Sequence, residues 1–555
     1  MRLAAGLAIL AVATPVLIVT EFGPRLAAGA GAAVGGIPPG MLGPLLFNLF
    51  SFMAFITSVA AGWYFASDAI AHERREGTLE LLFLAPVRPR DVVLSKLFTV
   101  LWRAAQWLLA VIPIFALPVL AGGVRGRDLL VLAALAANTL FWSIATSLYA
   151  SSKARTVFEA LSSTLVLQIA FLTIPFAMDL AVYSVNSGNF VIRAGIINPI
   201  FGWTHGNAAT PVDLGLHFVL VHAAAWITVL LTVRRTSQQI RQNPSIRPVG
   251  PVAHLNDRWK FGSAAARTTF RRRLLAVHPI RWLVERERGP GRFLLGVLVI
   301  VLLALPTAWL VSPDSNLFLS VGTLVLALFS IVLAVMFAAQ ATRFLIESRR
   351  TGALELILVS PLSSRQILHG HFQSLLRVFA APILILVIGQ AIVAYAQATF
   401  FANNLPATAT GPAGATTTLT EMMRYQWINA VFHIVVVGLS YISLAWTGAW
   451  MGLACRQASL ALFASLGIAK ILPVFAASVA QATFMPMILA NRIPAWLPFV
   501  TQNVIAITFH VTLIFVARYQ LLPDLRKILD LPHRFVLPAF GTKAPPMLPA
   551  PTVRT

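Results

Sequence analysis

His72-Glu-Arg-Arg-Glu-Gly-Thr-Leu-Glu-Leu-Leu-Phe-Leu-Ala-Pro86, followed by Val87-Arg-Pro-Arg90, returns later in the chain as Glu347-Ser-Arg-Arg-Thr-Gly-Ala-Leu-Glu-Leu-Ile-Leu-Val-Ser-Pro361, followed by Leu362-Ser-Ser-Arg365. A shift of 275 residues aligns 74–90 with 349–365, and eight of these 17 positions are identical. We name residues 72–90 the first charged segment and residues 347–365 the second charged segment. Because self-similarity at a fixed spacing reveals how a fold is assembled, this repeat predicts two related halves.

The composition indicates a membrane protein. Hydrophobic residues make up 58% of the chain and charged residues 11%, well below the charged share of a soluble protein. Apolar runs of about 20 residues, the length of a membrane-spanning helix, recur throughout. The net charge of +23 would suggest nucleic acid in a soluble protein, but in a membrane protein it indicates cationic cytoplasmic loops. A single cysteine, Cys455, excludes an internal disulfide and a cysteine metal cluster.

The apolar runs predict an all-α polytopic fold with about 12 transmembrane helices. The predicted spans are 3–22, 41–67, 97–120, 128–150, 157–182, 213–233, 291–312, 316–341, 372–397, 426–453, 458–482 and 495–517. Each charged segment lies between the second and third spans of its half. An even number of spans per half places both segments on one side of the membrane and predicts two parallel six-helix repeats. We therefore expect four regions, which are a first unit 1–233, a basic linker 234–290, a second unit 291–518 and a tail 519–555.

Lysine and arginine set the expected orientation. Of those outside the spans, 33 fall on the side of the charged segments and six on the other side. Cationic loops stay in the cytoplasm, so both termini, both charged segments and the linker are expected there. Residues 3–22 have an alternative interpretation as a signal peptide, since small residues follow the apolar run. On the outer side, 183–212 is long and apolar enough to dip back into the membrane, and the composition of 398–425 predicts a flexible loop.

Within each charged segment the apolar residues recur at helical spacing. Leu354, Ile357 and Leu358 share one helical face. Leu79, Leu82 and Phe83 do the same in the first half. Each set predicts a short amphipathic helix at the cytoplasmic surface. Pro86 and Pro361 are expected to end these helices, because proline cannot donate a backbone hydrogen bond. A second short helix is predicted to start at Pro89 in the first half and at residues 363–364 in the second.

Two glycines and two glutamates stand out in the charged segments. Gly77 and Gly352 precede the apolar runs, where glycine predicts a bend or a close approach of backbones. Glu80 and Glu355 lie inside the apolar runs. Each is either a solvated or arginine-paired carboxylate, or a polar contact that the protein needs twice.

The run Glu73-Arg-Arg-Glu-Gly-Thr-Leu-Glu-Leu-Leu82, with Pro86, Arg90 and Lys96, resembles the cytoplasmic signature of type-2 ABC transporter permeases, and both halves resemble that six-span unit. The resemblance implies an exporter subunit in a prokaryotic plasma (inner) membrane, whose charged segments dock on two separate ABC ATPase chains. The coupling residues implied are Glu73, Arg74, Arg75, Gly77, Thr78, Glu80, Pro86, Arg90, Arg349, Arg350, Gly352, Glu355, Pro361 and Arg365. His371 stands where Lys96 does, and Ala353 where Thr78 does, which leaves the equivalence of the two docking sites open.

The linker supports the same resemblance. Residues 278–288 can form a helix with Pro279 in its first turn, an apolar face and a break at Gly289-Pro-Gly291. This helix resembles the surface-lying entry helix that precedes the first span in the family. In the first half only Met1 and Arg2 precede the predicted span, which leaves two explanations open: the entry helix has been lost there, or the start of the sequence is misplaced.

The sequence carries no pattern for catalysis. It contains no phosphate-binding Gly-x-x-x-x-Gly-Lys-Ser/Thr loop, so this chain is expected to bind no cofactor, and ATP belongs on a partner ATPase. It also lacks a zinc-binding histidine pair on a span and a Gly-x-Ser-x-Gly elbow, so we expect no enzyme activity. Lys470 lies well inside the eleventh span and is the candidate for the translocation path. Six further ionisable residues are expected to be packed or interfacial, namely Glu159, Asp179, His217, His222, His433 and His510.

Three functions fit these patterns. The first is the ATP-driven permease, with the lipid bilayer, two ATPases and an unknown substrate as partners and no nucleic acid. The second is an ATP-independent secondary transporter of 6+6 topology, which is disfavoured by the length of the loop between spans two and three. The third is a membrane scaffold that docks an ATPase without transporting anything.

Overall fold

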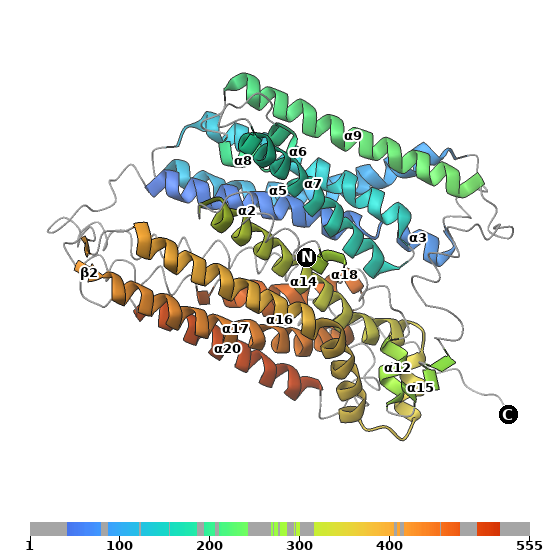
Figure 1. Cartoon of the computed structure of the whole chain (residues 1–555). Coiled ribbons are helices and arrows are strands. Elements are labelled where there is room, and N and C mark those ends of the chain that lie inside the picture. The colour runs from blue at the N-terminus through green and yellow to red at the C-terminus, as the bar shows by residue number, and fades with distance from the viewer. Residues whose placement is uncertain are drawn as a thin grey trace, which may run out of the picture.

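The computed structural model describes residues 42–78, 87–120, 124–154, 156–185, 194–205, 210–241, 268–269, 271–272, 274–275, 278–285, 294, 296–299, 316–404, 408–410, 416–455, 457–474, 476–477 and 497–521. These residues are helical apart from turns and one pair of three-residue strands, so the predicted all-α class is confirmed (Figure 1). The predicted span 3–22 and most of 291–312 lie outside the described residues, as does the tail 519–555 beyond residue 521.

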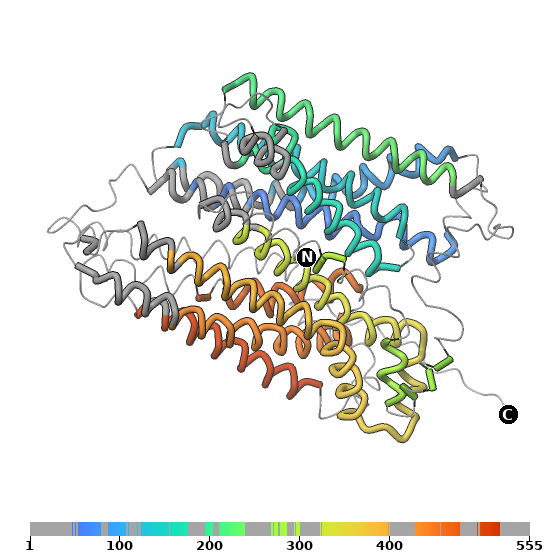
Figure 2. The backbone as a smooth tube through the Cα atoms, viewed as in Figure 1, coloured from blue at the N-terminus to red at the C-terminus, as the bar shows by residue number. Residues whose placement is uncertain are grey.

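Among its described residues, the first half contains five long helices and three short ones. They are α2 (Leu42–Ala66), α3 (Ala71–Glu76), α5 (Pro89–Leu120), α6 (Gly126–Lys153), α7 (Val157–Val185), the 3-10 helix η1 (Ala194–Ile197), α8 (Phe201–His205) and α9 (Pro211–Arg241). The long ones coincide with predicted spans two to six. Figure 2 traces this half as one bundle that lies beside the bundle of the second half.

The second half follows the linker helix α12 (Pro279–Glu285). Its elements are α14 (Asn316–Arg350), α15 (Ala353–Val359), α16 (Ser364–Asn404), β1 (Thr408–Thr410), β2 (Thr416–Thr418), α17 (Leu419–Ala454), α18 (Ala458–Leu466), the π-helical turn η2 (Gly467–Ile471) and α20 (Leu497–Leu521). The strands pair antiparallel, with Ala409 opposite Thr417. They correct the prediction that 398–425 is a flexible loop, because its threonines favour strand pairing.

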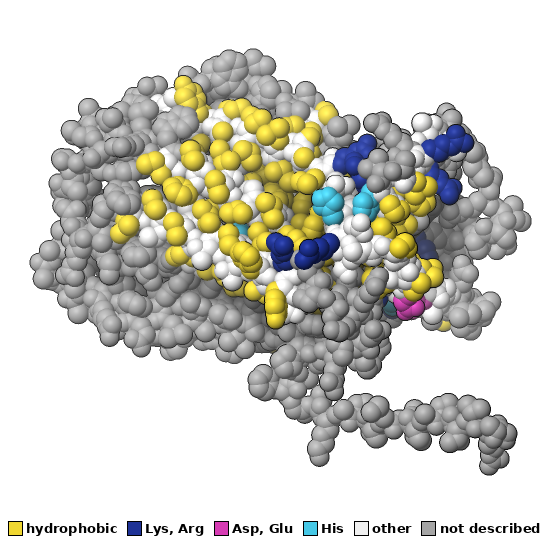
Figure 3. Space-filling model, turned by 90° about the horizontal axis from the view of Figure 1, so that it is seen from below, with side chains coloured by type: hydrophobic (Ala, Val, Ile, Leu, Met, Phe, Trp, Pro, Cys, Tyr) yellow, Lys and Arg dark blue, Asp and Glu magenta, His cyan; other side chains and the backbone are white. Residues whose placement is uncertain are grey.

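Seven helices among the described residues are long and apolar enough to cross a membrane, which makes the chain a polytopic membrane protein by length and composition. They cover 126–153, 157–175, 211–238, 325–350, 364–397, 428–454 and 500–521. Large apolar side chains face outward along them, such as Val219 on α9, Leu384 on α16 and Val431 on α17. Figure 3 shows one such face, a broad apolar band with Lys and Arg gathered toward one end. Lipid replaces water as the favourable surroundings of such a surface.

Corresponding helix pairs pack together in the two halves. The pairs are α2 with α6, α6 with α9, α2 with α5 and α6 with α7 in the first half, and α14 with α17, α17 with α20, α14 with α16 and α17 with α18 in the second. Each half therefore centres on its fourth-span helix, α6 or α17. The second bundle repeats the contacts of the first, although the sequences diverge outside the charged segments.

One apolar cluster joins the two halves. α7 packs against α14, α18 packs against α2, and α7 and α18 also meet each other. Trp63 of α2 lies edge-on to Phe463 of α18, with ring centroids 4.6 Å apart, and its indole donates a 3.0 Å hydrogen bond to the Leu161 carbonyl. When the two halves are exchanged, α7 takes the place of α18 and α2 takes the place of α14. The α7–α14 contact then becomes the α18–α2 contact, and the α7–α18 contact maps onto itself, as in an isologous dimer interface.

η1 and α8, the described helices of the stretch 183–212, pack against α2, α6, α7 and α9. Asn198 donates to the Leu172 carbonyl at 2.6 Å, and the Trp203 indole donates to Thr139 at 3.0 Å. Buried His217 bonds the Ile196 carbonyl at 2.8 Å. These bonds satisfy polar groups that would otherwise be costly among apolar helices.

Candidate functional site

Both charged segments lie at the same end of the helix bundle, where α3 and α15 are found in Figure 1. In the second half, α14 runs unbroken to Arg350, a turn contains Gly352, and α15 follows. The chain then turns through Pro361 and enters α16 at Ser364. In the first half, residues 79–86 lie outside the described residues, so Glu80, Pro86 and the first amphipathic helix cannot be compared with their predictions.

The predicted second short helix is wrong in both halves. Pro89 and Ser364 are the first residues of the long helices α5 and α16, which continue into the third span of each half. No proline lies in the first turns after either start, and Gly370 in the second turn of α16 does not interrupt that helix. The start signals themselves are confirmed, because Ser363 and Gln366 form a reciprocal cap.

Gly77 and Gly352 adopt the same left-handed conformation, with φ angles of 72° and 70°. A Cβ added at either position would meet nothing within 4 Å. The predicted bend is therefore confirmed, and the alternative of a close backbone approach is wrong. Glycine is favoured here because a side chain destabilises the left-handed region, whatever space is free around it.

Arg74 and Arg349 make equivalent hydrogen bonds. The Arg74 guanidinium donates to the carbonyls of Ser152 and of Ala154, the latter at 3.2 Å, at the C-terminal end of α6. Arg349 donates to the Leu453 carbonyl at 2.6 Å, at the C-terminal end of α17. The last carbonyls of a helix lack partners within it and carry partial negative charge, so a cation there is stabilising. Each arginine thus ties a charged segment to the fourth-span helix of its own half.

The helix α15 has the two faces that its sequence predicts. Leu354 is buried, and Ile357 and Leu358 pack beside it against α14, α16 and α12. On the opposite face, Leu356 is 77% exposed and Val359 is 87% exposed.

Glu355 of α15 is exposed too, and so are Arg350, Pro361 and Arg365, which flank α15 in the sequence. The second charged segment therefore exposes both apolar and charged side chains.

The first charged segment is held by two ion pairs. Glu73 pairs with Lys96 of α5, and Arg75 pairs with Asp68 at 2.8 Å. The Thr78 hydroxyl donates to the Glu73 carbonyl at 3.2 Å. Arg90 is exposed.

The second charged segment lacks these pairs, because Ser348 replaces Glu73, His371 replaces Lys96 and Arg343 replaces Asp68. His371 is fully buried, stacks on Phe344 and bonds the Ala341 carbonyl at 3.1 Å. The described parts of the two segments thus share the glycine turn and the arginine contact, and they differ in their internal electrostatics.

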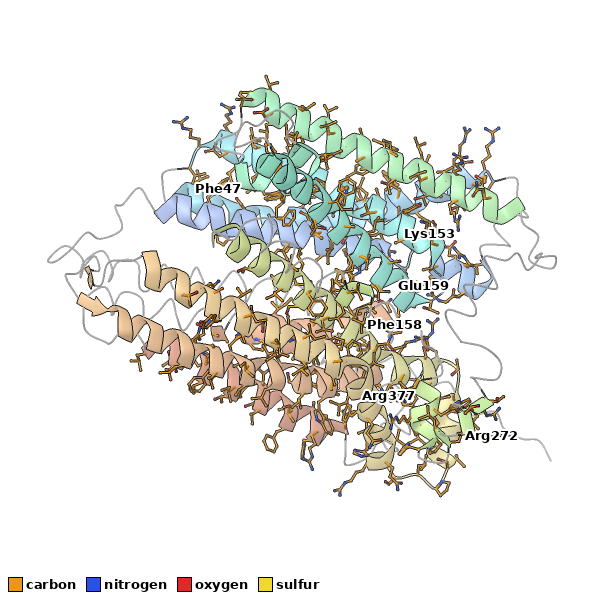
Figure 4. The ribbon with its side chains drawn as sticks, in the orientation of Figure 1. Phe47, Lys153, Phe158, Glu159, Arg272 and Arg377 are labelled. Carbon is orange, nitrogen blue, oxygen red and sulfur yellow. The ribbon has the colours of Figure 1, made fainter. Side chains whose placement is uncertain are left out.

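The linker helix α12 packs against α16, beside the second charged segment. Glu285 is buried and pairs with Arg281 and with Arg377 of α16, both at 2.7 Å. Figure 4 labels Arg377 where α16 passes α12. Burial, followed by the charge of nearby His369, lowers the pKa of His278 below its usual value. Sequence analysis predicted the amphipathic α12 but missed its partner, because no local pattern connects Glu285 to a residue 92 positions away.

Lys470 lies in η2 and turns toward α17. Its ammonium donates to the Ser440 hydroxyl at 2.6 Å and lies 3.9 Å from the centre of the Tyr441 ring. Among the residues that the structure describes, no carboxylate pairs with it. Lys470 therefore contacts α17 within the second half and takes no part in either charged segment.

The described residues contain no group of three or more metal-ligating side chains. In comparisons with known proteins, no family model, no curated protein and no solved structure matches the chain.

Proposed function

We propose that the chain is the membrane-spanning permease subunit of an ATP-driven ABC exporter, in which the charged segments dock on two separate ATPase subunits. One observation carries this proposal. Two charged segments, each with a left-handed glycine and an arginine bonded to the end of α6 or α17, lie at the same end of the bundle. A membrane subunit that is driven by two identical or related ATPase subunits needs one docking element for each of them.

In this proposal the two halves are parallel six-span repeats with twelve spans in all, and both termini and the linker lie in the cytoplasm of a prokaryotic cell. Support comes from the repeated helix pairs, from the exchange-symmetric contacts between halves and from the distribution of Lys and Arg. The substrate path runs between the halves. This chain binds no ATP and catalyses no reaction, and export is the direction that the family resemblance implies.

The outer face of α15 is the proposed docking surface of the second half. Leu356 and Val359 expose apolar area beyond the predicted membrane span, and Glu355 and Arg365 border it. Apolar centres with charged rims are typical of protein interfaces. By the 275-residue correspondence, the docking surface of the first half would include Glu80 and Pro86, which lie outside the described residues, next to Arg74, Arg75 and Gly77.

Movement of a docked ATPase reaches the membrane through the two arginines. Arg349 joins the second charged segment to the end of α17, on which α14, α16, α18 and α20 all pack. Arg74 joins the first segment to α6 in the same way. Gly352 and Gly77 supply the bends that turn each segment away from the preceding helix. A pull on both segments would therefore shift both fourth-span helices together.

The test is an affinity purification of the full chain from its own membranes in mild detergent, with copurifying proteins identified by mass spectrometry. We expect a phosphate-loop ATPase in stoichiometric amount, and we expect Leu356→Asp together with Glu355→Ala to weaken its recovery at least tenfold. Val212→Asp is the matched control, since Val212 is 78% exposed at the start of α9, at the opposite end of the bundle. Transport by the purified chain with no ATPase present, driven by an ion gradient, would contradict the proposal and favour a secondary transporter.

A further inference from the structure

One side of the helix α5 is exposed over several turns. Leu94, Phe98, Trp102 and Leu109 lie on it at helical spacing, and Phe98 is 68% exposed. The helices α2, α6 and α9 pack against the remaining sides of α5. Arg103 is exposed beside Trp102, and we name these five residues the α5 face. The α5 face runs from the end of the bundle that holds the charged segments into the predicted span 97–120.

The equivalent side of α16 is covered by the linker helix α12. Gly370 of α16 is buried, and a Cβ added to it would lie 2.5 Å from the His278 ring, just before α12. Its counterpart 275 residues earlier is Ser95, which is exposed. Likewise Ser374 is buried, whereas its counterpart Thr99 is exposed. The second half therefore covers a surface that the first half leaves open.

An arginine lies at this level in both halves, but only one of the two is paired. Arg377 of α16 pairs with the buried Glu285 of α12 at 2.7 Å. Arg103 of α5 lies one position beyond the counterpart of Arg377. Among the residues that the structure describes, no carboxylate pairs with Arg103. The acidic residue of α5 itself, Asp91, precedes Arg103 by twelve residues, about 18 Å along the helix.

The neighbouring helices bring no carboxylate to Arg103 either. α2 contains no acidic residue. Asp128 of α6 and Asp213 of α9 lie in the first turns of their helices, at the opposite end of the bundle. Glu73 of α3 is paired with Lys96. The negative charge that balances Arg103 must therefore come from outside the described part of the chain.

The depth of Arg103 indicates where that charge lies. Arg103 follows the start of the predicted span by six residues, about 9 Å. Helical side chains lean toward the N-terminal end of their helix, which for α5 is the end that holds the charged segments. The guanidinium therefore extends toward the nearer membrane surface, as long cationic side chains do near the ends of spans. Phospholipid phosphates lie at that surface, and a guanidinium binds phosphate through two parallel hydrogen bonds.

The shape of the α5 face favours a lipid over a second helix like α12. On α16 the residue under α12 is glycine, and the close approach leaves no room for a Cβ. Ser95 has a side chain at that position, so a helix cannot lie equally close to α5. Acyl chains adapt to an uneven apolar surface such as that of Phe98 and Leu109, and Trp102 has the side chain that is enriched at membrane surfaces.

We propose that the α5 face binds an anionic phospholipid from the leaflet on the side of the charged segments. Its phosphate lies on Arg103 and its acyl chains lie along Phe98 and Leu109. A net negative lipid is required, because a zwitterionic headgroup carries its own cation and leaves the charge of Arg103 unbalanced. In the second half the carboxylate of Glu285 takes the place of this phosphate. The inference requires that the chain lies in a membrane and does not depend on the proposed function.

The test is photocrosslinking of the full chain in nanodiscs that contain a minority of phosphatidylglycerol in phosphatidylcholine. A benzophenone amino acid replaces Phe98, and the crosslinked molecules are identified by mass spectrometry. The matched control places the same amino acid at Leu376 of α16, which is 63% exposed and adjoins Arg377. Both probes sit beside an arginine near the same membrane surface, and only the arginine at Leu376 is paired with a carboxylate.

We expect phosphatidylglycerol at Phe98 to exceed its share of the bilayer at least threefold, and at Leu376 to equal that share. Arg103→Met should remove the excess at Phe98. Arg235→Met should leave it unchanged, because Arg235 is an exposed arginine at the end of α9 away from the α5 face. Glu285→Gln should create an excess at Leu376, because it leaves Arg377 without its carboxylate. If Arg103→Met fails to fold, the comparison of the two probes with Arg103 intact still decides.

Three results would overturn the proposal. One is phosphatidylglycerol at Phe98 in no more than its share of the bilayer, and another is an excess that persists in Arg103→Met. The third is crosslinking of the Phe98 probe to a second copy of the chain or to another protein in place of lipid, which would assign the α5 face to a protein partner. No excess at Leu376 in Glu285→Gln would contradict the argument that an unbalanced arginine selects the lipid.

Discussion

Replacing Gly352 by Ala tests whether the left-handed turn sets the position of α15. A non-glycine residue in the left-handed region is destabilised by about 1–2 kcal/mol, and the added Cβ would meet nothing within 4 Å, so steric overlap adds nothing. The reduced freedom of the unfolded chain offsets part of this, which leaves a net effect of about 1 kcal/mol. That energy corresponds to a factor of about 5 in the population of the bent conformation.

The assay is hydrogen–deuterium exchange of residues 353–359 in the full chain in detergent. We expect about fivefold faster exchange in Gly352→Ala and less in Gly352→Asn, because asparagine tolerates the left-handed region better than alanine. Gly126→Ala is the matched control, since Gly126 also has open space around it but no positive φ. Unchanged exchange in Gly352→Ala, or an equal increase in Gly126→Ala at its own helix, would refute the reasoning.

Three further perturbations follow from the contacts. Arg349→Met removes a charge-assisted bond to the Leu453 carbonyl, and we expect a loss of about 1.5–3 kcal/mol, measured as a lower thermal unfolding midpoint. Glu285→Gln removes the ion pairs that hold α12 on α16, and we expect faster tryptic cleavage after Arg281. His278 has a lowered pKa when α12 is docked, so the undocked state binds protons more readily. We therefore expect the docking of α12 to be fully stable above pH 6.5 and to weaken as the pH falls below that value. Fluorine NMR of fluorotryptophan at Trp282 measures the docked fraction.

Each of these has a result that contradicts it. Arg350→Met removes an exposed arginine next to Arg349, and an equal loss in both variants would exclude the carbonyl bond as the cause. Cleavage after Arg281 at the same rate in Glu285→Gln and the unmodified chain would mean that apolar contacts alone dock α12. A Trp282 signal that titrates equally in His278→Gln would assign the pH dependence to another group.

The sequence predicted the parts of this fold that local physics determines. Apolar length alone placed both ends of α2, α6 and α7 within about three residues, because a membrane span needs about 20 apolar residues. It placed only one end of α9 and of α17 as closely, since α9 continues to Arg241 and α17 begins at Leu419. Helix starts at Pro89 and Ser364 followed from proline and serine chemistry. The separate second helix was wrong, since a start signal says nothing about where a helix ends. The strand pair β1–β2 was missed because six residues in a composition-biased loop carry little signal.

The candidate site was predictable to a similar extent. The spacing of Leu354, Ile357 and Leu358 correctly gave the buried face of α15, and the repeat drew attention to Gly352. The partner of Arg349 was not predictable, because its carbonyl acceptor lies 104 residues away and depends on how α14 packs on α17. Long-range pairs of this kind are specified by tertiary packing, and a single sequence carries no pattern for them.

The difference between the two charged segments has a consequence for genetics. When two identical chains associate, any codon change appears at both docking surfaces, so no surface can vary alone. Here Glu73 and Lys96 in one half correspond to Ser348 and His371 in the other, on a single polypeptide. Under the proposed function, each docking surface can therefore accumulate substitutions independently, and one gene can come to encode docking sites for two unlike ATPases. A change at Glu73 also leaves the second surface intact in the same molecule, which provides an internal reference that a homodimer does not offer.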